Sequence, residues 1–151
     1  MIVYRITKVT FKDDISGLGA KLYGSRWNTQ GLSMLYTAEH ISLAVLEVLI
    51  HLEKSEIPVS YWLLTIKMPD SAAGIVIDSN KLKNNWAADE GYTQFMGSQF
   101  LINNESLFLK VPSAVINEES NFLLNPIHKD FKKVQIVKTN EFNFDTRLFS
   151  F

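Results

Sequence analysis

The stretch Leu43–Ile50 reads LAVLEVLI, seven apolar residues interrupted by one carboxylate, Glu47. Apolar side chains recur at helical spacing from Ile41 to Leu52, which predicts a helix over residues 39–53. Because this helix is apolar on nearly every side, we expect it to be buried on more than one face. Glu47 should therefore lie inside the protein or at the floor of a cleft.

A carboxylate in such a place needs a partner, because an unpaired buried charge is costly or takes up a proton. His51 follows Glu47 by four residues on the same helical face and is placed to supply a hydrogen bond. Two interpretations stay open from the pattern alone. Glu47 is either a structural anchor tied to an arginine elsewhere or a functional group, since buried carboxylates are rare and are enriched in sites.

The rest of the chain predicts many short strands and one further helix. The helix is expected at residues 92–102, and the strands at residues 2–6, 34–37, 61–68, 74–78, 106–111, 113–116, 121–124 and 133–138. Few helices and many strands favour an α+β class with a mixed or mostly antiparallel sheet. The stretch 16–31, SGLGAKLYGSRWNTQG, is expected to be a loop because glycine marks unusual backbone angles.

Arg26 lies in this loop, which holds four of the seven glycines of the chain. An arginine in such a loop can present its guanidinium to a phosphate or carboxylate while backbone N–H groups close around the same anion. The alternative is a turn arginine paired with Asp13 or Asp14. Trp27 and Tyr36, taken singly, are more typical of a core than of a ligand site.

Composition excludes several function classes. The 151 residues fit one domain, and the lack of cysteine excludes thiolate nucleophiles and iron–sulfur clusters. A formal charge of −1 gives no reason to expect nucleic acid or an anionic membrane as a partner. No apolar run approaches the roughly 18 residues of a membrane helix, and the histidines lack metal-ligand spacing. A soluble, cytoplasmic protein without a metal is expected.

Five motifs follow one another along the chain: GAKLYGSRWNTQG (19–31), LYTAEH (35–40), LAVLEVLIHL (43–52), VPSAV (111–115) and NFLLNPIHKDF (121–131). Together they resemble the RES domain family, named for an arginine, a glutamate and a serine. The resemblance covers nearly the whole chain and implies one RES domain over residues 1–151. It also implies a fold similar to ADP-ribosyltransferases of the diphtheria-toxin kind, with a mixed or antiparallel β core and a few flanking helices.

Members of the family are toxins of bacterial toxin–antitoxin pairs, usually encoded beside an Xre-type antitoxin. The resemblance implies that the chain breaks down NAD⁺ as its substrate, without a separate cofactor. The family's catalytic residues fall on Arg26, Tyr36, Glu47 and Ser113. The expected substrate contacts are Arg26, Trp27, Asn28, Tyr36 and Asn121. The sequence departs from the family pattern at Ser25, Phe122 and Thr146, outside this set.

The chemistry of these residues agrees with that implication. Cleavage of the bond between nicotinamide and ribose builds oxocarbenium-like charge on the sugar. A carboxylate fixed in a poorly solvated cleft stabilises that charge more in the transition state than in the ground state. Glu47 would supply the carboxylate, while Ser113 and Asn121 would orient the ribose or Glu47 itself.

Two alternatives accompany the hypothesis of NAD⁺ hydrolysis or phosphorolysis. In the first, the chain is a mono-ADP-ribosyltransferase, and a protein side chain takes the place of water or phosphate. In the second, it is a catalytically idle module whose cleft only engages a partner. The family implies an antitoxin partner, and the content of 46% apolar residues is compatible with a homodimer.

Overall fold

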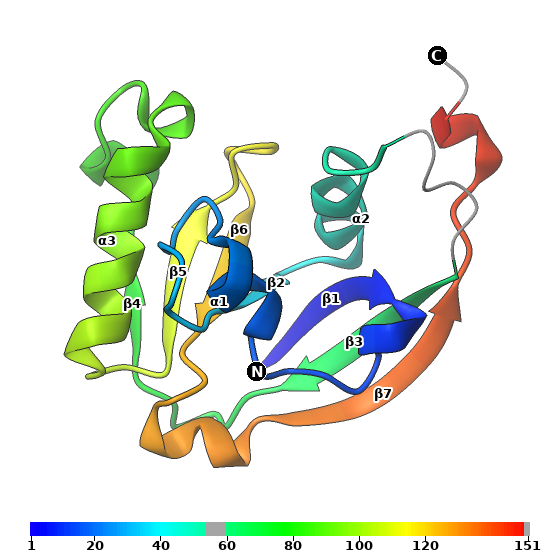
Figure 1. Ribbon diagram of the computed structural model, residues 1–151, viewed down its shortest axis with the longest axis horizontal. Coiled ribbons are helices and arrows are strands. Elements are labelled where there is room, and N and C mark those ends of the chain that lie inside the picture. Colours follow the sequence, from blue (N-terminus) through cyan, green and yellow to red (C-terminus); the bar gives the residue numbers. More distant parts are fainter. Residues whose placement is uncertain (54–59, 150–151) are drawn as a thin grey trace.

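The computed structural model describes residues 1–53 and 60–149 and is built around one β-sheet (Figure 1). Its strands are β1 Ile2–Lys8, β2 Leu35–Ala38, β3 Tyr61–Lys67, β4 Gly74–Val76, β5 Phe108–Pro112, β6 Ser120–Leu124 and β7 Gln135–Phe142. The α-helices of this part of the chain are α1 Leu18–Tyr23, α2 Ile41–Leu49 and α3 Glu90–Asn103.

The seven strands lie in the order β4-β5-β6-β2-β1-β3-β7. The pair β4–β5 is parallel, and the other neighbouring pairs are antiparallel. This confirms the α+β class with a mixed sheet. Strands β1 and β2 are central, so side chains on them lie well away from the edges of the sheet. In Figure 1, α3 stands beside β4 at one end of the sheet.

Helix α2 packs on β1 and β2 through its apolar face. Leu43 and Ala44 are buried there against Ile6, Ala38 and Tyr61. The expected burial on more than one face is met only at Leu43 and Ala44, since the other residues of the helix are half-buried or exposed. The helix ends at Leu49, four residues earlier than predicted. After it, the His51 N–H donates to the Val48 carbonyl and the Leu52 N–H to the Leu49 carbonyl. These bonds span three residues, as in a 3₁₀ turn, so the α-helical pattern does not continue.

The glycine-rich stretch is not all loop, because it contains the short helix α1. Gly17 and Gly24 lie at its two ends with φ angles of +72° and +69°. Only glycine takes this left-handed region without strain, so the chain can enter and leave the helix abruptly. Between them, Leu-Gly-Ala-Lys-Leu-Tyr contains several good helix formers, which the prediction of a loop overlooked.

The strand predicted at residues 113–116 is also wrong. The Ser113 Oγ accepts the N–H groups of Val115 at 3.0 Å and of Ile116 at 3.2 Å, which bends the chain away from β5. A serine side chain that captures nearby amides in this way competes with strand pairing. The segment between β5 and β6 is therefore a turn that holds Ser113 in one orientation.

The loop after α1 is fastened along one face of α3. Hydrogen bonds join them, from Gln94 Nε2 to the Ser25 carbonyl at 2.9 Å and from Thr93 Oγ1 to the Arg26 carbonyl at 2.6 Å. Ser98 Oγ accepts the Thr29 N–H at 3.2 Å and lies 3.3 Å from the Thr29 hydroxyl, with which it shares a further hydrogen bond. Gly97 lies on the same face, where a Cβ would stand 1.7 Å from the Trp27 carbonyl oxygen. The glycine that weakens the helix thus provides the space for the loop.

We predict that Gly97→Ala destabilises the protein by at least about 2 kcal/mol, because either the loop or α3 must move to accept the methyl group. Urea unfolding followed by circular dichroism measures the change. Gly91→Ala on the same helix is the matched control, since its Cβ meets only Asp89 Oδ1 at 3.5 Å. The control should leave stability unchanged or raise it by up to about 1 kcal/mol. Equal stability of both variants would contradict the tight contact.

Candidate functional site

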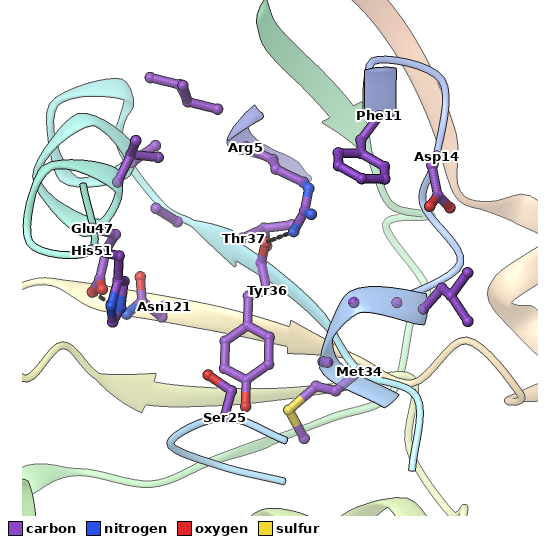
Figure 2. A pocket seen from close by; sticks show the side chains of 18 of the residues that line it. Arg5, Phe11, Asp14, Ser25, Met34, Tyr36, Thr37, Glu47, His51 and Asn121 are labelled. Atoms are coloured by element: carbon purple, nitrogen blue, oxygen red, sulfur yellow. Dashed lines mark hydrogen bonds between the residues drawn. The ribbon is translucent and has the colours of Figure 1, made fainter. Parts of the chain in front are cut away.

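A cleft of about 410 Å³ opens beside α2, over β1 and β2 (Figure 2). Its walls come from β1 and the segment after it, from α1 and the start of the following loop, from β2, from α2 and from β6. The charged and polar side chains that line it include Arg5, Asp14, Ser25, Tyr36, Thr37, Glu47, His51 and Asn121. The sequence had placed three of them, Tyr36, Glu47 and Asn121, in the site.

Glu47 reaches the cleft from α2 and is held by two donors from other parts of the chain. Its Oε1 accepts a hydrogen bond from Ser113 Oγ at 2.8 Å and another from Asn121 Nδ2 at 2.6 Å. Both bonds end on one oxygen. The prediction that His51 supplies the bond is wrong, since within residues 1–53 and 60–149 the donors to Glu47 are Ser113 and Asn121. His51 lines the same cleft (Figure 2).

Ser113 does not line the cleft and is fully buried behind Glu47. Because its oxygen already accepts the amides of Val115 and Ile116, its single proton is directed to Glu47 Oε1. Asn121 lies at the start of β6, opposite Ala38 of β2 and Val111 of β5. The sheet register therefore fixes the second donor, and the turn fixes the first.

Tyr36 lines the cleft from β2, with its hydroxyl tied to the loop. The phenol donates to Asn28 Oδ1 at 2.7 Å and accepts the Trp27 N–H at 3.0 Å. Burial raises the pKa of the Tyr36 phenol well above its usual value, and the hydrogen bond from Trp27 opposes this only in part. The phenol therefore stays neutral, and the ring is presented to the cleft in a fixed orientation.

Trp27 and Asn28 fold the loop and are not among the described residues that line the cleft. Asn28 is fully buried, and its Nδ2 lies within hydrogen-bond distance of three carbonyl oxygens, those of Ala20, Thr29 and Leu32, at 2.9 to 3.1 Å. Trp27 is 2% exposed, with its ring 5.9 Å from that of Trp86. Both side chains support the wall from behind.

Arg26 is also outside the described lining of the cleft. Its Nη1 donates to the Ala87 carbonyl at 2.6 Å, which ties the loop to the segment before α3. This bond is to neither Asp13 nor Asp14. The expected contact of Arg26 with the substrate stays a prediction, because the bond to Ala87 uses one of the five guanidinium N–H groups.

Arg5 is the cleft residue that the sequence analysis missed. It extends from β1, and its Nη1 donates to the Tyr36 carbonyl at 3.2 Å. Burial lowers the pKa of the guanidinium, and the charge of Asp14 opposes that shift. The only signal in the sequence was a charge inside the apolar strand IVYRI. Its meaning depends on the sheet order, which places β1 between β2 and β3.

Within residues 1–53 and 60–149, no three His, Asp or Glu side chains gather in a way that could hold a metal ion. Over the same ranges no helix has the length and apolar character needed to cross a membrane. The described residues that line the cleft present a carboxylate, a guanidinium, a phenol and an amide.

Comparison with known sequences shows that a model of one protein family matches most of the chain. The model of the RES domain family matches residues 2–145. A protein of Photorhabdus laumondii named Toxin Res is 41% identical, over 98% of this chain and 97% of that protein. A protein of Sphingobium named Prs ADP-ribosylating toxin is 35% identical, over 90% of this chain and 87% of its own length. A protein of Pseudomonas putida named Toxin Res is 34% identical, over 99% of this chain and 100% of that protein.

Comparison with solved structures supports the fold. A chain in the crystal structure of the M. tuberculosis MbcT–MbcA toxin–antitoxin complex aligns with a TM-score of 0.80 at 20% identity, over 94% of this chain and 84% of that chain. This agreement supports the α+β fold with a mixed sheet described above. Since the family model spans residues 2–145 and full-length relatives exceed 30% identity, the chain belongs to the RES domain family.

Proposed function

We propose that the chain is the toxin of a toxin–antitoxin pair and that it consumes NAD⁺ by cleaving the bond between nicotinamide and ribose. The observation that carries this proposal is Glu47, a carboxylate in an open cleft with one oxygen held by Ser113 and Asn121. Relatives named Toxin Res support the toxin role. The cytoplasm is the expected place of action.

The arrangement of Glu47 suits a developing cation. Two donors occupy Oε1, which leaves Oε2 as the oxygen that can face a ribose in the cleft. As the bond between C1′ and the nicotinamide nitrogen breaks, its electron pair goes to the ring, which leaves neutral. The positive charge that forms on the sugar is then stabilised by a carboxylate that needs no rearrangement at that moment.

Tyr36 would contact the nicotinamide or the edge of the ribose with its ring. Its hydroxyl is already bound to Asn28 and to the Trp27 amide, so the ring enters the cleft as a rigid apolar surface. Trp27 and Asn28 would affect the substrate only through Tyr36 and the loop. Arg26 would likewise act by holding that loop against Ala87.

Three kinds of nucleophile can accept the ADP-ribosyl group at C1′. Water gives ADP-ribose, inorganic phosphate gives its 1-phosphate, and a protein side chain gives a modified target. In each case the new bond forms at C1′ and the acceptor loses a proton to solvent. The relative named Prs ADP-ribosylating toxin, 35% identical, favours keeping protein modification as the second candidate.

We also propose a cognate antitoxin as partner, of the Xre type that the family resemblance implies. The structural relative was solved as a toxin–antitoxin complex, which supports a partner for this chain as well. A homodimer stays a prediction. Protein without its antitoxin should be the form that shows activity.

We predict that Glu47→Gln lowers nicotinamide release from NAD⁺ by about 10²- to 10³-fold, because the neutral amide cannot balance the charge on the ribose. Chromatography of purified protein incubated with NAD⁺ measures the release. Glu105→Gln, an exposed glutamate outside the cleft, is the matched control and should match the unaltered protein. Equal release by Glu47→Gln and its parent would overturn the proposed role of Glu47.

The acceptor is tested by running the same reaction with and without phosphate and with bacterial lysate. We expect ADP-ribose, or its 1-phosphate when phosphate is present, as the product identified by mass spectrometry. ADP-ribose attached to a lysate protein, without free product, would instead establish the second candidate. An NAD⁺ pool that stays intact under all conditions, with no protein labelled, would contradict both and favour a binding module.

The roles of Ser113 and Asn121 are tested by a double-mutant cycle. Each of Ser113→Ala and Asn121→Ala should lower kcat about tenfold with little change in KM, since each removes one charge-assisted bond that orients Glu47. In a Glu47→Gln background the same changes should have little further effect. Losses that add fully in that background would show that the two residues act on the substrate directly.

A further inference from the structure

The side chain of Glu39 completes the sheet at the point where the chain leaves it. Strand β2 ends at Ala38 and α2 begins at Ile41, so Glu39 lies in the short connection between them (Figure 1). Its N–H donates to the Ser120 carbonyl at 3.1 Å, as in a continued antiparallel ladder. The Ser120 N–H donates at 2.6 Å to Glu39 Oε1, where a continued ladder would use the Glu39 carbonyl. The carboxylate therefore takes the place of a backbone acceptor.

The other oxygen of this carboxylate faces a cation from the neighbouring strand. Glu39 Oε2 lies 3.6 Å from Lys110 Nζ on β5, and the Glu39 side chain is only 22% exposed. Salt screens such a partly buried pair less than it screens two fully exposed charges. The Lys110 ammonium in turn lies 5.3 Å from the centre of the Phe122 ring on β6. One carboxylate thus joins the connection to α2 with both β6 and β5.

The backbone that Glu39 holds also carries the donors to Glu47. Asn121 directly follows Ser120 at the start of β6, and its Nδ2 donates to Glu47 Oε1 at 2.6 Å. The residue before Ser120 accepts the Ser113 N–H through its carbonyl at 2.9 Å. At the other end of the contact, α2 begins two residues after Glu39 and carries Glu47. Glu39 therefore lies between the element that carries the carboxylate of the cleft and the segment that carries its donors.

We propose that Glu39 is a positioning residue for the reaction at Glu47: by accepting the Ser120 N–H it fixes the start of β6 relative to α2 and keeps Asn121 on Glu47 Oε1. The inference rests on the proposed function, since it concerns how the same carboxylate is oriented. Asn121 and Glu47 are 74 positions apart in the chain, and a hydrogen bond weakens steeply when its geometry is disturbed. Glu39 is not among the described residues that line the cleft, so it acts on the substrate only through these groups.

The first test separates the bond to Ser120 from the charge of Glu39. Glu39→Ala removes both and should lower kcat for nicotinamide release about tenfold, with KM changed by less than about twofold. Glu39→Gln keeps an oxygen that can accept the Ser120 N–H, so its kcat should stay within about threefold of that of the unaltered protein. Glu119→Gln is the matched control, because the Glu119 carboxylate pairs with His40 at 3.5 Å, and it should leave kcat unchanged.

A double-mutant cycle shows whether Glu39 acts through Asn121. In protein that carries Asn121→Ala, Glu39→Ala should lower kcat further by less than about threefold, because the bond that Glu39 protects is already absent. Equal tenfold losses in both backgrounds would overturn the proposal, since Glu39 would then act elsewhere. A Glu39→Gln protein as impaired as Glu39→Ala would also overturn it, since the acceptor for Ser120 is retained in the glutamine.

NMR gives a readout that does not depend on any reaction. The signals of the Asn121 side-chain amide, identified by their loss in Asn121→Ala, should move in Glu39→Ala toward their position in Glu47→Ala, where the bond cannot form. In Glu39→Gln they should stay close to those of the unaltered protein. If Glu39→Ala fails to fold in a thermal melt, Glu39→Asp replaces it, because the shorter carboxylate reaches Ser120 poorly and should shift the same signals by a smaller amount.

The two readouts separate this inference from the proposed function. If the Asn121 signals shift as expected but the unaltered protein releases no nicotinamide, positioning by Glu39 stands and the proposed reaction fails. If Glu47-dependent release is observed but neither the Asn121 signals nor kcat depends on Glu39, the reaction stands and this inference fails.

Discussion

The two hydrogen bonds that end on Glu47 Oε1 are the interaction on which the site depends. They connect α2 to residues 66 and 74 positions later in the chain, one in a turn and one on β6. Each donor is itself fixed, Ser113 by two backbone amides and Asn121 by pairing with β2 and β5. The carboxylate is therefore positioned by the whole sheet, and its second oxygen is left for a ligand.

The opposite side of the site is formed by the loop after α1, which is held by other parts of the fold. Helix α3 supplies hydrogen bonds from Thr93, Gln94 and Ser98 and the space at Gly97. Asn28 closes the interior of the loop, and the Tyr36 hydroxyl links it to β2. The family's arginine, Arg26, belongs to this support through its bond to Ala87. Residues that a family motif marks as functional can thus be divided into those that touch the cleft and those that shape it.

Much of this was predictable from local patterns. One carboxylate in an apolar helix indicated correctly that Glu47 lies at a cleft, and short apolar runs indicated most of the strands. Predictions from local patterns failed where a residue's partner lies far away in the sequence. His51 was the only partner of Glu47 visible within one helix, whereas the true donors come from β6 and a turn. That turn was itself misjudged as a strand, because the hydrogen bonds of Ser113 do not appear in a hydrophobicity pattern.

Arg5 illustrates the same limit. A charged residue in a first strand is ordinary if the strand is at an edge and unusual if it is central, and the sequence does not say which. The order β2-β1-β3 makes it central and places the guanidinium in the cleft. The resemblance to a family supplied Tyr36, Glu47, Ser113 and Asn121, and it also named Arg26, whose contact with the substrate stays a prediction.

The most direct test of this account is a crystal structure of the Glu47→Gln protein with NAD⁺ bound. We expect the nicotinamide ribose with its C1′ against residue 47 and the ring of Tyr36 in contact with the nicotinamide or that ribose. NAD⁺ bound elsewhere, or in the cleft with its ribose turned away from residue 47, would contradict the account.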